Sequence, residues 1–248
     1  MRLAVISDIH GNLLALEAVL ADIEGRGVDA IVNLGDCVTS PLWPKETFDR
    51  LGELDLPTVR GNHDRWIVEM PEAKLSPAGR LARAALSEAE RAALHALPPT
   101  LEVSPDILAV HGTPADDSTY LLEDAIEGRL APAARATVAA RLGAAARPGG
   151  VVLCGHSHRQ AVVQGPEGCL VLNPGSVGCP VFADSPAAPT LEHRSPHARY
   201  AILTRRRGAW GAELMVLDYD WHAAARQAAA NGREDWAVAM ATGAVSPA

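Results

Sequence analysis

The sequence predicts a protein of the α/β class, and three features support this prediction. Short apolar runs alternate with stretches of helical periodicity, as in residues 3–6, 13–23 and 30–34. A strand–helix–strand order of this kind implies a parallel strand pair joined by a right-handed crossover. Glycines such as Gly11 and Gly35 follow these runs, where the chain must turn sharply. The composition, with 48% hydrophobic and 21% charged residues, is ordinary for a globular protein.

The first half of the chain contains three predicted strands. A helix over residues 13–23 follows the first strand, and Gly27 is placed to end it. The second strand covers residues 30–34, and a short helical pattern spans 48–54. A third short strand is expected at residues 57–60. Each of these strands leads into a polar turn.

The second half repeats the alternation of strands and helices. Ser87 and Glu90 have the spacing of a capping box, which predicts the start of a helix. An alanine-rich helix is expected over residues 132–146, and a helical C-terminal stretch over 222–241. Further strands are expected at residues 107–110, 151–154, 170–172, 200–203 and 214–217.

Two connecting segments have a distinctive composition. Residues 180–197 are rich in proline, serine and alanine, and they predict a long surface loop. Such a loop can cover a site, mediate dimerisation or be disordered, and the sequence leaves these alternatives open. The arginine run 205–207 precedes Gly208 at an expected hairpin turn, where it would form a solvated tip. No linker divides the chain, so we expect a single domain over residues 1–248.

Charge and cysteine usage argue against several classes of function. The net charge of −8 argues against broad electrostatic binding to nucleic acid or to anionic membranes. Neither a signal peptide nor an apolar run of membrane-spanning length is visible. The four cysteines have no C-x-x-C spacing, which favours reduced core thiols over disulfides or zinc clusters. We therefore expect a cytoplasmic protein that binds a small substrate, with homo-oligomerisation left open.

Polar residues suited to metal binding or proton transfer lie directly after the predicted strands. In α/β sheets, this carboxyl edge is where ligand sites form. Of the nine histidines, only His95, His193, His197 and His222 lie elsewhere. Taken singly, each polar residue could be a hydrogen-bonded turn residue, but the shared position favours one common site. The residues at this edge are Asp8, His10, Asp36, Asn62, His63, Asp64, His111, His156 and His158.

These side chains supply carboxylate, imidazole and amide groups but no obvious thiolate. Such ligands suit divalent ions such as manganese, iron, zinc or nickel better than a soft thiolate site would. The set is too large for one tetrahedral ion. If Asp36 is shared, it suffices for two ions about 3.5–4 Å apart, the separation used for in-line phosphoryl displacement. The sequence therefore predicts a site for two divalent metal ions.

Several motifs occur in a fixed order along the chain, and together they are more specific than any one alone. They are Asp8-x-His10, Gly35-Asp36, Gly61-Asn62-His63-Asp64, His111, Gly155-His156-Ser157-His158 and Asn173-Pro174-Gly175-Ser176-Val177-Gly178. The set resembles the calcineurin-like metallophosphoesterase superfamily, in particular its small single-domain bacterial and archaeal branch. The resemblance implies two mixed β-sheets packed as a sandwich and flanked by helices, a four-layer fold. Periodicity alone would not distinguish this fold from a single Rossmann-like sheet.

The resemblance also implies which residues hold each metal ion. One ion would be bound by Asp8, His10, Asp36 and His158. The other would be bound by Asp36, Asn62, His111 and His156, with Asp36 bridging the pair. Manganese is the expected metal, with iron, nickel and zinc as alternatives.

Other residues would act on the substrate rather than on the metal. By resemblance, His63 would protonate the leaving-group oxygen, and Asp64 would orient His63. A positioned imidazole donor of this kind adds roughly 10²–10⁴-fold to a rate. Asn12 could contact phosphate or cap the following helix, and the sequence does not favour either role. Ser176 is a further candidate for phosphate contact.

The predicted function is a phosphoesterase that uses two metal ions to cleave phosphodiester or phosphomonoester bonds. Metal-activated hydroxide would attack phosphorus, with His63 as the general acid. Two alternatives remain. A binding scaffold, like the retromer subunit of this fold, has no chemical need for His63. A protein phosphatase would be expected to carry larger inserted regions.

Overall fold

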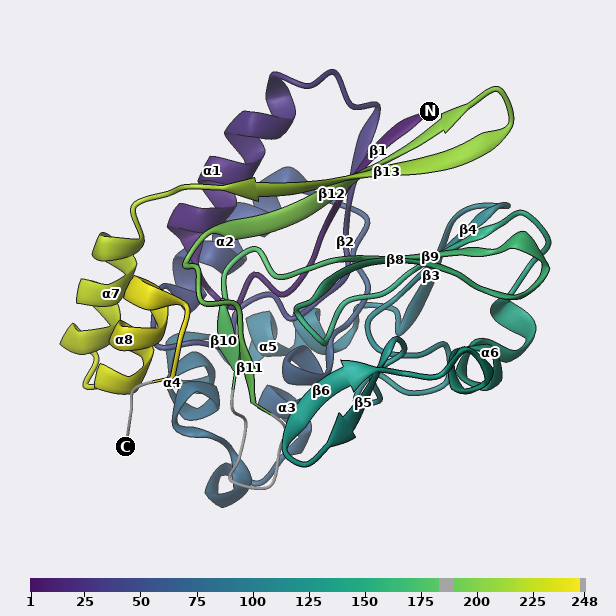
Figure 1. Ribbon diagram of the computed structural model, residues 1–248. Coiled ribbons are helices and arrows are strands. Elements are labelled where there is room, and N and C mark those ends of the chain that lie inside the picture. Colours follow the sequence, from purple (N-terminus) through teal and green to yellow (C-terminus); the bar gives the residue numbers. More distant parts are fainter. Residues whose placement is uncertain (183–189, 246–248) are drawn as a thin grey trace.

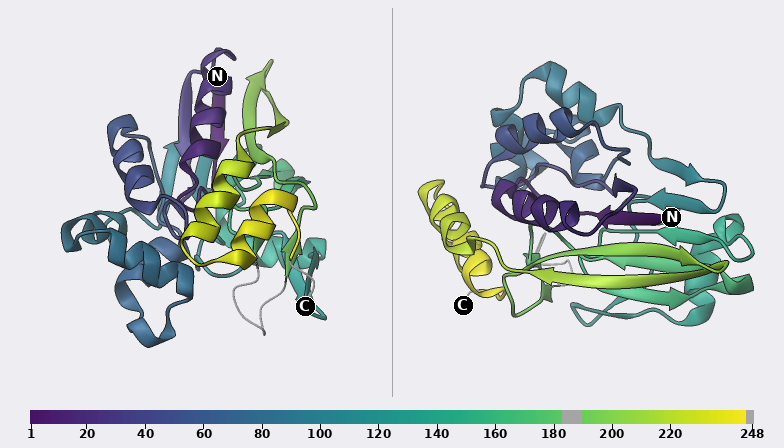
Figure 2. Two further views of the ribbon diagram at one scale, coloured as in Figure 1. Left: turned by 90° about the vertical axis from the view of Figure 1, so that its left-hand side faces the viewer. Right: turned by 90° about the horizontal axis from the view of Figure 1, so that it is seen from above.

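Two β-sheets pack face to face in this protein, with helices on their outer sides (Figures 1 and 2). The computed structural model describes residues 1–182 and 190–245. The two mixed sheets confirm the sandwich that the resemblance implied. Within the described residues, no helix has the combination of length and apolar content that crossing a membrane requires.

The first sheet consists of β1 (Arg2–Ile6), β2 (Ala30–Asn33), β12 (Ala198–Arg206) and β13 (Ala209–Leu217). Their order across the sheet is β13-β12-β1-β2. β1 and β2 are parallel, as the strand–helix–strand pattern predicted, and β12 runs antiparallel to β1. β12 and β13 form the predicted hairpin, in which Arg207 and Gly208 turn the chain with φ angles of 52° and 83°.

The second sheet consists of β3 (Thr100–Ser104), β4 (Ile107–Val110), β7 (Val151–Leu153), β8 (Gln160–Gln164) and β9 (Leu170–Pro174). Their order is β3-β4-β7-β9-β8. The three central strands are parallel, and the two edge strands pair antiparallel with their neighbours. The carboxyl ends of β4 and β7 therefore lie at the same edge of this sheet.

Helices and two small hairpins complete the fold. The helices are α1 (Leu13–Glu24), α2 (Pro44–Leu54), α3 (Asn62–Glu69), α4 (Pro77–Ala85), α5 (Glu88–His95), α6 (Arg135–Leu142), α7 (Trp221–Ala230) and α8 (Glu234–Thr242). Short 3-10 turns lie at Glu72–Lys74, Gly143–Ala145 and Pro166–Gly168. The hairpins pair β5 (Glu123–Ile126) with β6 (Arg129–Pro132), and β10 (Val181–Phe182) with β11 (Leu191–Glu192).

The central core lies between the two sheets. Val5 of β1 belongs to this core, together with Leu153 of β7 and Leu172 of β9, and all three are fully buried. On the outer side of the first sheet, Leu16 of α1 packs in one cluster with Ile202 of β12. Full burial of such side chains contributes about 1.5–3 kcal/mol each. The strands that carry the site are thus held by packing on both faces.

Three sequence-based expectations differ from the structure. Residues 57–60 form only an isolated bridge to β2, because Pro57 has no N–H to donate and the chain soon turns away. α1 ends at Glu24, before Gly27. The segment 180–197 is not simply a surface loop, because its apolar ends pair as β10 and β11 and are largely buried. Residues 183–189 of that segment lie outside the described part of the chain.

Candidate metal centre

Loops at the carboxyl ends of β1, β2, β4 and β7, together with the start of α3, bring the predicted metal ligands together at one end of the sandwich. Backbone bonds tie these loops to one another. Gly155 N–H donates to the carbonyl of His111 at 2.7 Å, and His156 N–H donates to Asp8 Oδ2 at 3.2 Å. All of the predicted ligands are at most 8% exposed. They are Asp8, His10, Asp36, Asn62, His111, His156 and His158.

Most of these ligands have a strained backbone. Asp8, His10, Asp36, His156 and His158 have φ angles between 48° and 65°, in the left-handed region. A non-glycine residue there costs about 1–3 kcal/mol and persists only where the surrounding structure holds it. Strain of this kind clusters at functional sites, and here it turns successive side chains toward a common centre.

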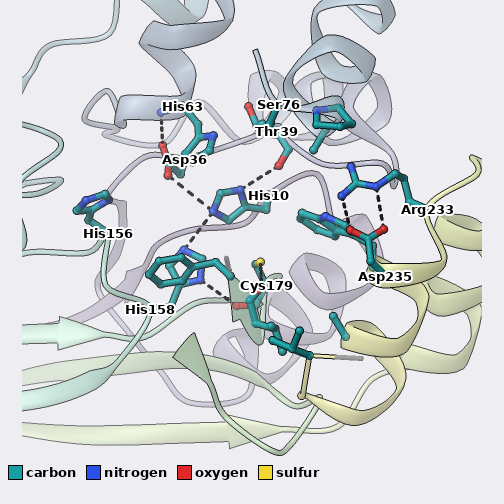
Figure 3. A pocket seen from close by; sticks show the side chains of 17 residues that line it. His10, Asp36, Thr39, His63, Ser76, His156, His158, Cys179, Arg233 and Asp235 are labelled. Carbon is teal, nitrogen blue, oxygen red and sulfur yellow. Dashed lines mark hydrogen bonds and ion pairs between the residues drawn. The ribbon is translucent and has the colours of Figure 1, made fainter. Parts of the chain in front are cut away.

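Backbone carbonyls fix the orientation of His10 and His158, the two histidines that lie close to Asp8 (Figure 3). His10 Nδ1 lies 3.0 Å from the carbonyl oxygen of Thr39, and His158 Nδ1 lies 2.9 Å from that of Cys179. Because a carbonyl can only accept, each Nδ1 carries the hydrogen. The Nε2 lone pairs of both rings are left for a cation, and these two atoms are 3.2 Å apart.

The other two histidines are held in the same way. His111 Nδ1 donates to the carbonyl of Leu34 at 2.7 Å, which leaves Nε2 facing the centre. In His156 the two ring nitrogens exchange roles. Nε2 donates to the carbonyl of Ser118 at 3.0 Å, which leaves Nδ1 for a cation. Hydrogen bonds of this kind from metal-binding histidines set the tautomer and the ring orientation.

The ligand atoms form two adjacent groups. Asp8, His10 and His158 offer atoms within 4.8 Å of one another, and so do Asp36, His111 and His156. Asp36 lies between the groups, with Oδ2 at 3.7 Å from His10 Nε2 and 3.3 Å from His111 Nε2. These distances suit a carboxylate that could be shared by two cations.

The protonation of these groups reflects their mutual charge. Burial acts to raise the pKa of Asp8, but the adjacent His158 outweighs it and lowers the pKa to about 2. Burial acts to lower the pKa of His111, but the Asp36 carboxylate raises it to about 10. Burial prevails at His10 and His156, where it lowers each pKa to about 4. Two carboxylates are thus balanced by imidazole protons, which bound divalent cations would replace.

Unsatisfied polar atoms indicate that the site fits a metal. Asp8 Oδ1 is buried and accepts no hydrogen bond from the described residues. Its near neighbours are the Nε2 atoms of His158, at 3.3 Å, and of His111, at 4.0 Å. Leaving a charged carboxylate oxygen buried without a hydrogen bond is costly, so a bound cation would relieve it. The oxygen and nitrogen donor set matches divalent transition ions.

His63 stands beside the ligands rather than among them. Its backbone N–H donates to Asp36 Oδ1 at 2.9 Å, and its ring meets that of His10 edge-on at 5.3 Å. The Asp64 carboxylate accepts from the backbone N–H groups of Asp36, Cys37 and Gly61 at 2.9–3.0 Å. Asp64 therefore fixes the turn from which His63 projects. That it orients the imidazole directly stays a prediction.

Asn12 and Ser176 are buried and hydrogen-bonded within the protein. Asn12 caps α1 by accepting from Ala15 N–H at 3.2 Å, which is one of the two roles the sequence left open. Its amide nitrogen donates to the carbonyl of Gly178 at 3.0 Å. The Ser176 hydroxyl donates to the carbonyl of Asp8 at 2.7 Å. Both side chains support the Asp8 loop, and their contact with substrate stays a prediction.

The structure adds contacts that sequence reasoning missed. His193, in the segment expected to be a surface loop, has Nε2 2.8 Å from the carbonyl oxygen of His158. Arg65 forms a paired ion bridge with Asp117, at 2.8 Å and 2.6 Å. The residue after Asp117 supplies the carbonyl that holds His156. No local motif marks either contact, because both join segments far apart in the sequence.

Comparison with known families agrees with this geometry. Residues 1–195 match the model of the calcineurin-like phosphoesterase superfamily domain. The chain belongs to the calcineurin-like phosphoesterase superfamily. An uncharacterised protein of Methanocaldococcus jannaschii is 50% identical over 62 residues, which are 25% of this chain and 26% of that protein. The chain therefore matches only about a quarter of this relative's length.

Solved structures resemble this calcineurin-like phosphoesterase over nearly its whole length. A metallophosphoesterase from Sphaerobacter thermophilus is 26% identical, with 98% of this chain and 100% of that chain covered and a TM-score of 0.72. A hypothetical protein from Pyrococcus horikoshii shares the fold, with 18% identity, coverage of 99% of both chains and a TM-score of 0.77. Both alignments include α7 and α8, which lie beyond the family match.

Gly61 is expected to tolerate no side chain. A Cβ at this position would lie 2.8 Å from Asp36 Cγ and still closer to Asp36 Oδ1. We expect Gly61→Ala to destabilise this protein by about 1–3 kcal/mol through overpacking and to reduce its metal content. Urea denaturation and metal analysis measure the two effects. Gly52→Ala in α2 is the control, because its Cβ meets open space and should stabilise the helix by about 0.5–1 kcal/mol. Equal behaviour of the two variants would contradict the prediction.

Arg65→Ala is expected to loosen the ligand group of Asp36, His111 and His156, although Arg65 is not itself a ligand. Hydrogen bonds to charged groups contribute about 1.5–3 kcal/mol, and the Asp117 side chain is only 13% exposed. Its loss should release the loop whose Ser118 carbonyl holds His156, and so weaken binding of the second ion. Denaturation and metal titration test both effects. Arg50→Ala, which breaks a remote pair with Glu17, is the matched control. Unchanged metal affinity in Arg65→Ala would count against this link.

Proposed function

We propose that this protein is a phosphoesterase that uses two divalent metal ions to hydrolyse phosphodiester or phosphomonoester bonds. The observation that carries the proposal is the pair of buried ligand groups, with Asp36 between them. Ligands of this type, at this spacing, suit in-line displacement at phosphorus. Membership of the phosphoesterase family supports the same reaction class.

In this proposal the predicted ligands divide between two ions. One would be held by Asp8, His10, Asp36 and His158. The other would be held by Asp36, Asn62, His111 and His156. Bound divalent ions supply a hydroxide nucleophile near neutral pH and neutralise charge on the phosphate oxygens. We expect manganese, because the nitrogen and oxygen ligands accept it, and iron, nickel or zinc are the alternatives.

We assign His63 as the proton donor to the leaving-group oxygen. Its ring lies 5.3 Å from that of His10 and lines the cavity that contains the ligands. An alkoxide is a poor leaving group, so a proton delivered to its oxygen lowers the barrier. Asp64 contributes by holding the turn at Gly61, and the Asp36 carboxylate accepts from the His63 N–H. The imidazole is thereby kept close to the ligands without joining them.

The substrate is expected to be a small phosphorylated molecule. The net charge of −8 gives no support to a nucleic-acid substrate, and we place the protein in the cytoplasm. Protein purified without chelator should contain metal. It should hydrolyse bis-p-nitrophenyl phosphate or p-nitrophenyl phosphate when manganese is added. Absence of turnover with any metal and any ester would refute the proposal and favour the binding scaffold.

A further inference from the structure

Two separate clefts open from the candidate metal centre. One has a volume of about 280 Å³ and runs from His10 and His158 to α8. The other has a volume of about 330 Å³ and lies against α3. His63 and His156 line both clefts. The reacting phosphate would therefore lie where the two clefts meet, with space on either side of it.

The cleft against α3, which we call the α3 cleft, has aromatic and apolar side chains on its walls beside polar ones such as Lys74 and Ser118. Trp66 lines it and packs on the ring of His63, with 4.8 Å between ring centroids. Tyr120 stacks on His156 at 4.5 Å with an angle of 18° between the rings. Met70 also lines this cleft. A planar group could pack here directly beside the residue assigned as general acid.

The cleft toward α8, which we call the α8 cleft, has aromatic walls as well. Phe182 lies 4.8 Å from the ring of His158, and Trp236 lines the same cleft from α8. Arg233 adds a guanidinium, which Asp235 holds through two hydrogen bonds of 2.8 Å and 2.6 Å (Figure 3). α8 lies beyond residues 1–195, so this wall is outside the family match.

We propose that the substrate is a phosphodiester with two planar or apolar arms, one for each cleft. The inference rests on the proposed function. A monoester has one arm and would occupy only one of the two clefts, whereas a diester with two arms can bury most of its surface in both. Because Trp66 lies against His63, the leaving arm is placed in the α3 cleft. The retained arm is placed in the α8 cleft, against Phe182 and Trp236.

The reaction balances in this arrangement. Hydroxide derived from water forms a new bond to phosphorus, and the bond from phosphorus to the leaving-arm oxygen breaks. That oxygen takes a proton from His63 and departs as an alcohol from the α3 cleft. The phosphomonoester of the retained arm is left in the α8 cleft. No oxidant or other co-reactant is required.

Binding of uncleavable analogues tests the two-armed assignment without turnover. Phosphinates have the charge of a diester, but their carbon–phosphorus bonds are not hydrolysed. Calorimetry with manganese-loaded protein should show diphenylphosphinate binding at least about tenfold more tightly than dimethylphosphinate, since two rings bury apolar surface. Methylphenylphosphinate, with one ring and the same charge, should lose most of this gain. Equal affinity for the three anions would overturn the proposal.

Substitutions assign each arm to its cleft. Trp66→Ala and Trp236→Ala should each weaken diphenylphosphinate about fivefold or more, and change dimethylphosphinate less than twofold. Trp66→Phe and Trp236→Phe should retain most of the affinity, because each keeps a ring. Trp210→Ala on β13 is the remote control. Equal losses for both phosphinates would mean that the tryptophans only support the metal centre. The analogue series with unaltered protein decides the question if an alanine variant does not fold.

Turnover separates this inference from the proposed function. Phenyl p-nitrophenyl phosphate and methyl p-nitrophenyl phosphate share a leaving group and differ only in the retained arm. The phenyl ester should have the higher kcat/KM. Trp236→Ala should reduce that preference at least about fivefold, whereas Trp66→Ala should slow the hydrolysis of both esters alike. Hydrolysis of both esters with a ratio unchanged in Trp236→Ala would overturn the two-armed substrate alone. If the protein prefers diphenylphosphinate but hydrolyses no ester, the proposed catalytic function is refuted and the assignment of one arm to each cleft is retained.

Discussion

Asp36→Asn is expected to abolish most of the metal-dependent activity. The side-chain oxygen of asparagine can still accept the hydrogen bond from the His63 backbone N–H, whose nitrogen lies 2.9 Å from Asp36 Oδ1, so the local turn should survive. The charge shared between the two ligand groups is lost. Metal ions contribute several kcal/mol of transition-state stabilisation, so loss of the pair should lower kcat/KM by roughly 10²–10⁴-fold. Steady-state kinetics, with metal analysis of the same sample, measures both effects.

Asp106→Asn is the matched control, because Asp106 is half-exposed and pairs with Arg205 far from the centre. It should keep full metal content and activity. Thermal denaturation of Asp36→Asn without metal should show a folded protein. If this variant binds both ions as tightly as the original chain, Asp36 does not bridge them.

The convergence of the predicted ligands at one end of the sandwich could be predicted from residue type and position. Asp8, Asp36 and His111 each follow a strand that apolar runs had already marked. Parallel strands end at a common edge, so residues after their ends must meet in space. Only the order of the strands and the direction of the chain enter this expectation. It holds within each sheet, because β1 with β2, and β4 with β7, are parallel pairs.

The groups that orient the ligands could not be predicted in the same way. His10, His111, His156 and His158 all bind backbone carbonyls, and every residue carries a carbonyl. The sequence therefore contains no mark that selects Ser118 over its neighbours. The same limit applies to Arg65 and Asp117, which meet only after the fold forms.

The residues that line the two clefts were predicted least well, for a related reason. Residues 180–197 had the composition of a loop, yet Phe182 lines the α8 cleft and Leu191 is only 7% exposed. A few apolar residues within a proline-rich stretch decide the burial, and composition averages over them. Trp236 shows no motif either, because its role depends on where α8 packs. The convergence of the predicted ligands was thus predictable, whereas the residues that line the two clefts were not.

His63→Asn is expected to retain both metal ions and to lose turnover by roughly 10²–10⁴-fold on alkyl phosphodiesters. Asparagine keeps the backbone N–H that donates to Asp36, so the ligand geometry should persist. The loss should be smaller for p-nitrophenyl esters, because p-nitrophenolate departs without a proton. Kinetics on an alkyl and an aryl diester, with metal analysis, measures this difference.

The dependence on the leaving group distinguishes a proton donor from other roles. His222→Asn, at an exposed site on α7, is the control and should change neither metal content nor rate. A ligand role for His63 predicts loss of metal in His63→Asn, and a purely steric role predicts equal loss for both classes of ester. Only a donor to the leaving oxygen predicts full metal content together with a loss that grows as the leaving alcohol becomes less acidic. That combination follows from the position of His63 beside the ligands and against Trp66, at the junction of the two clefts.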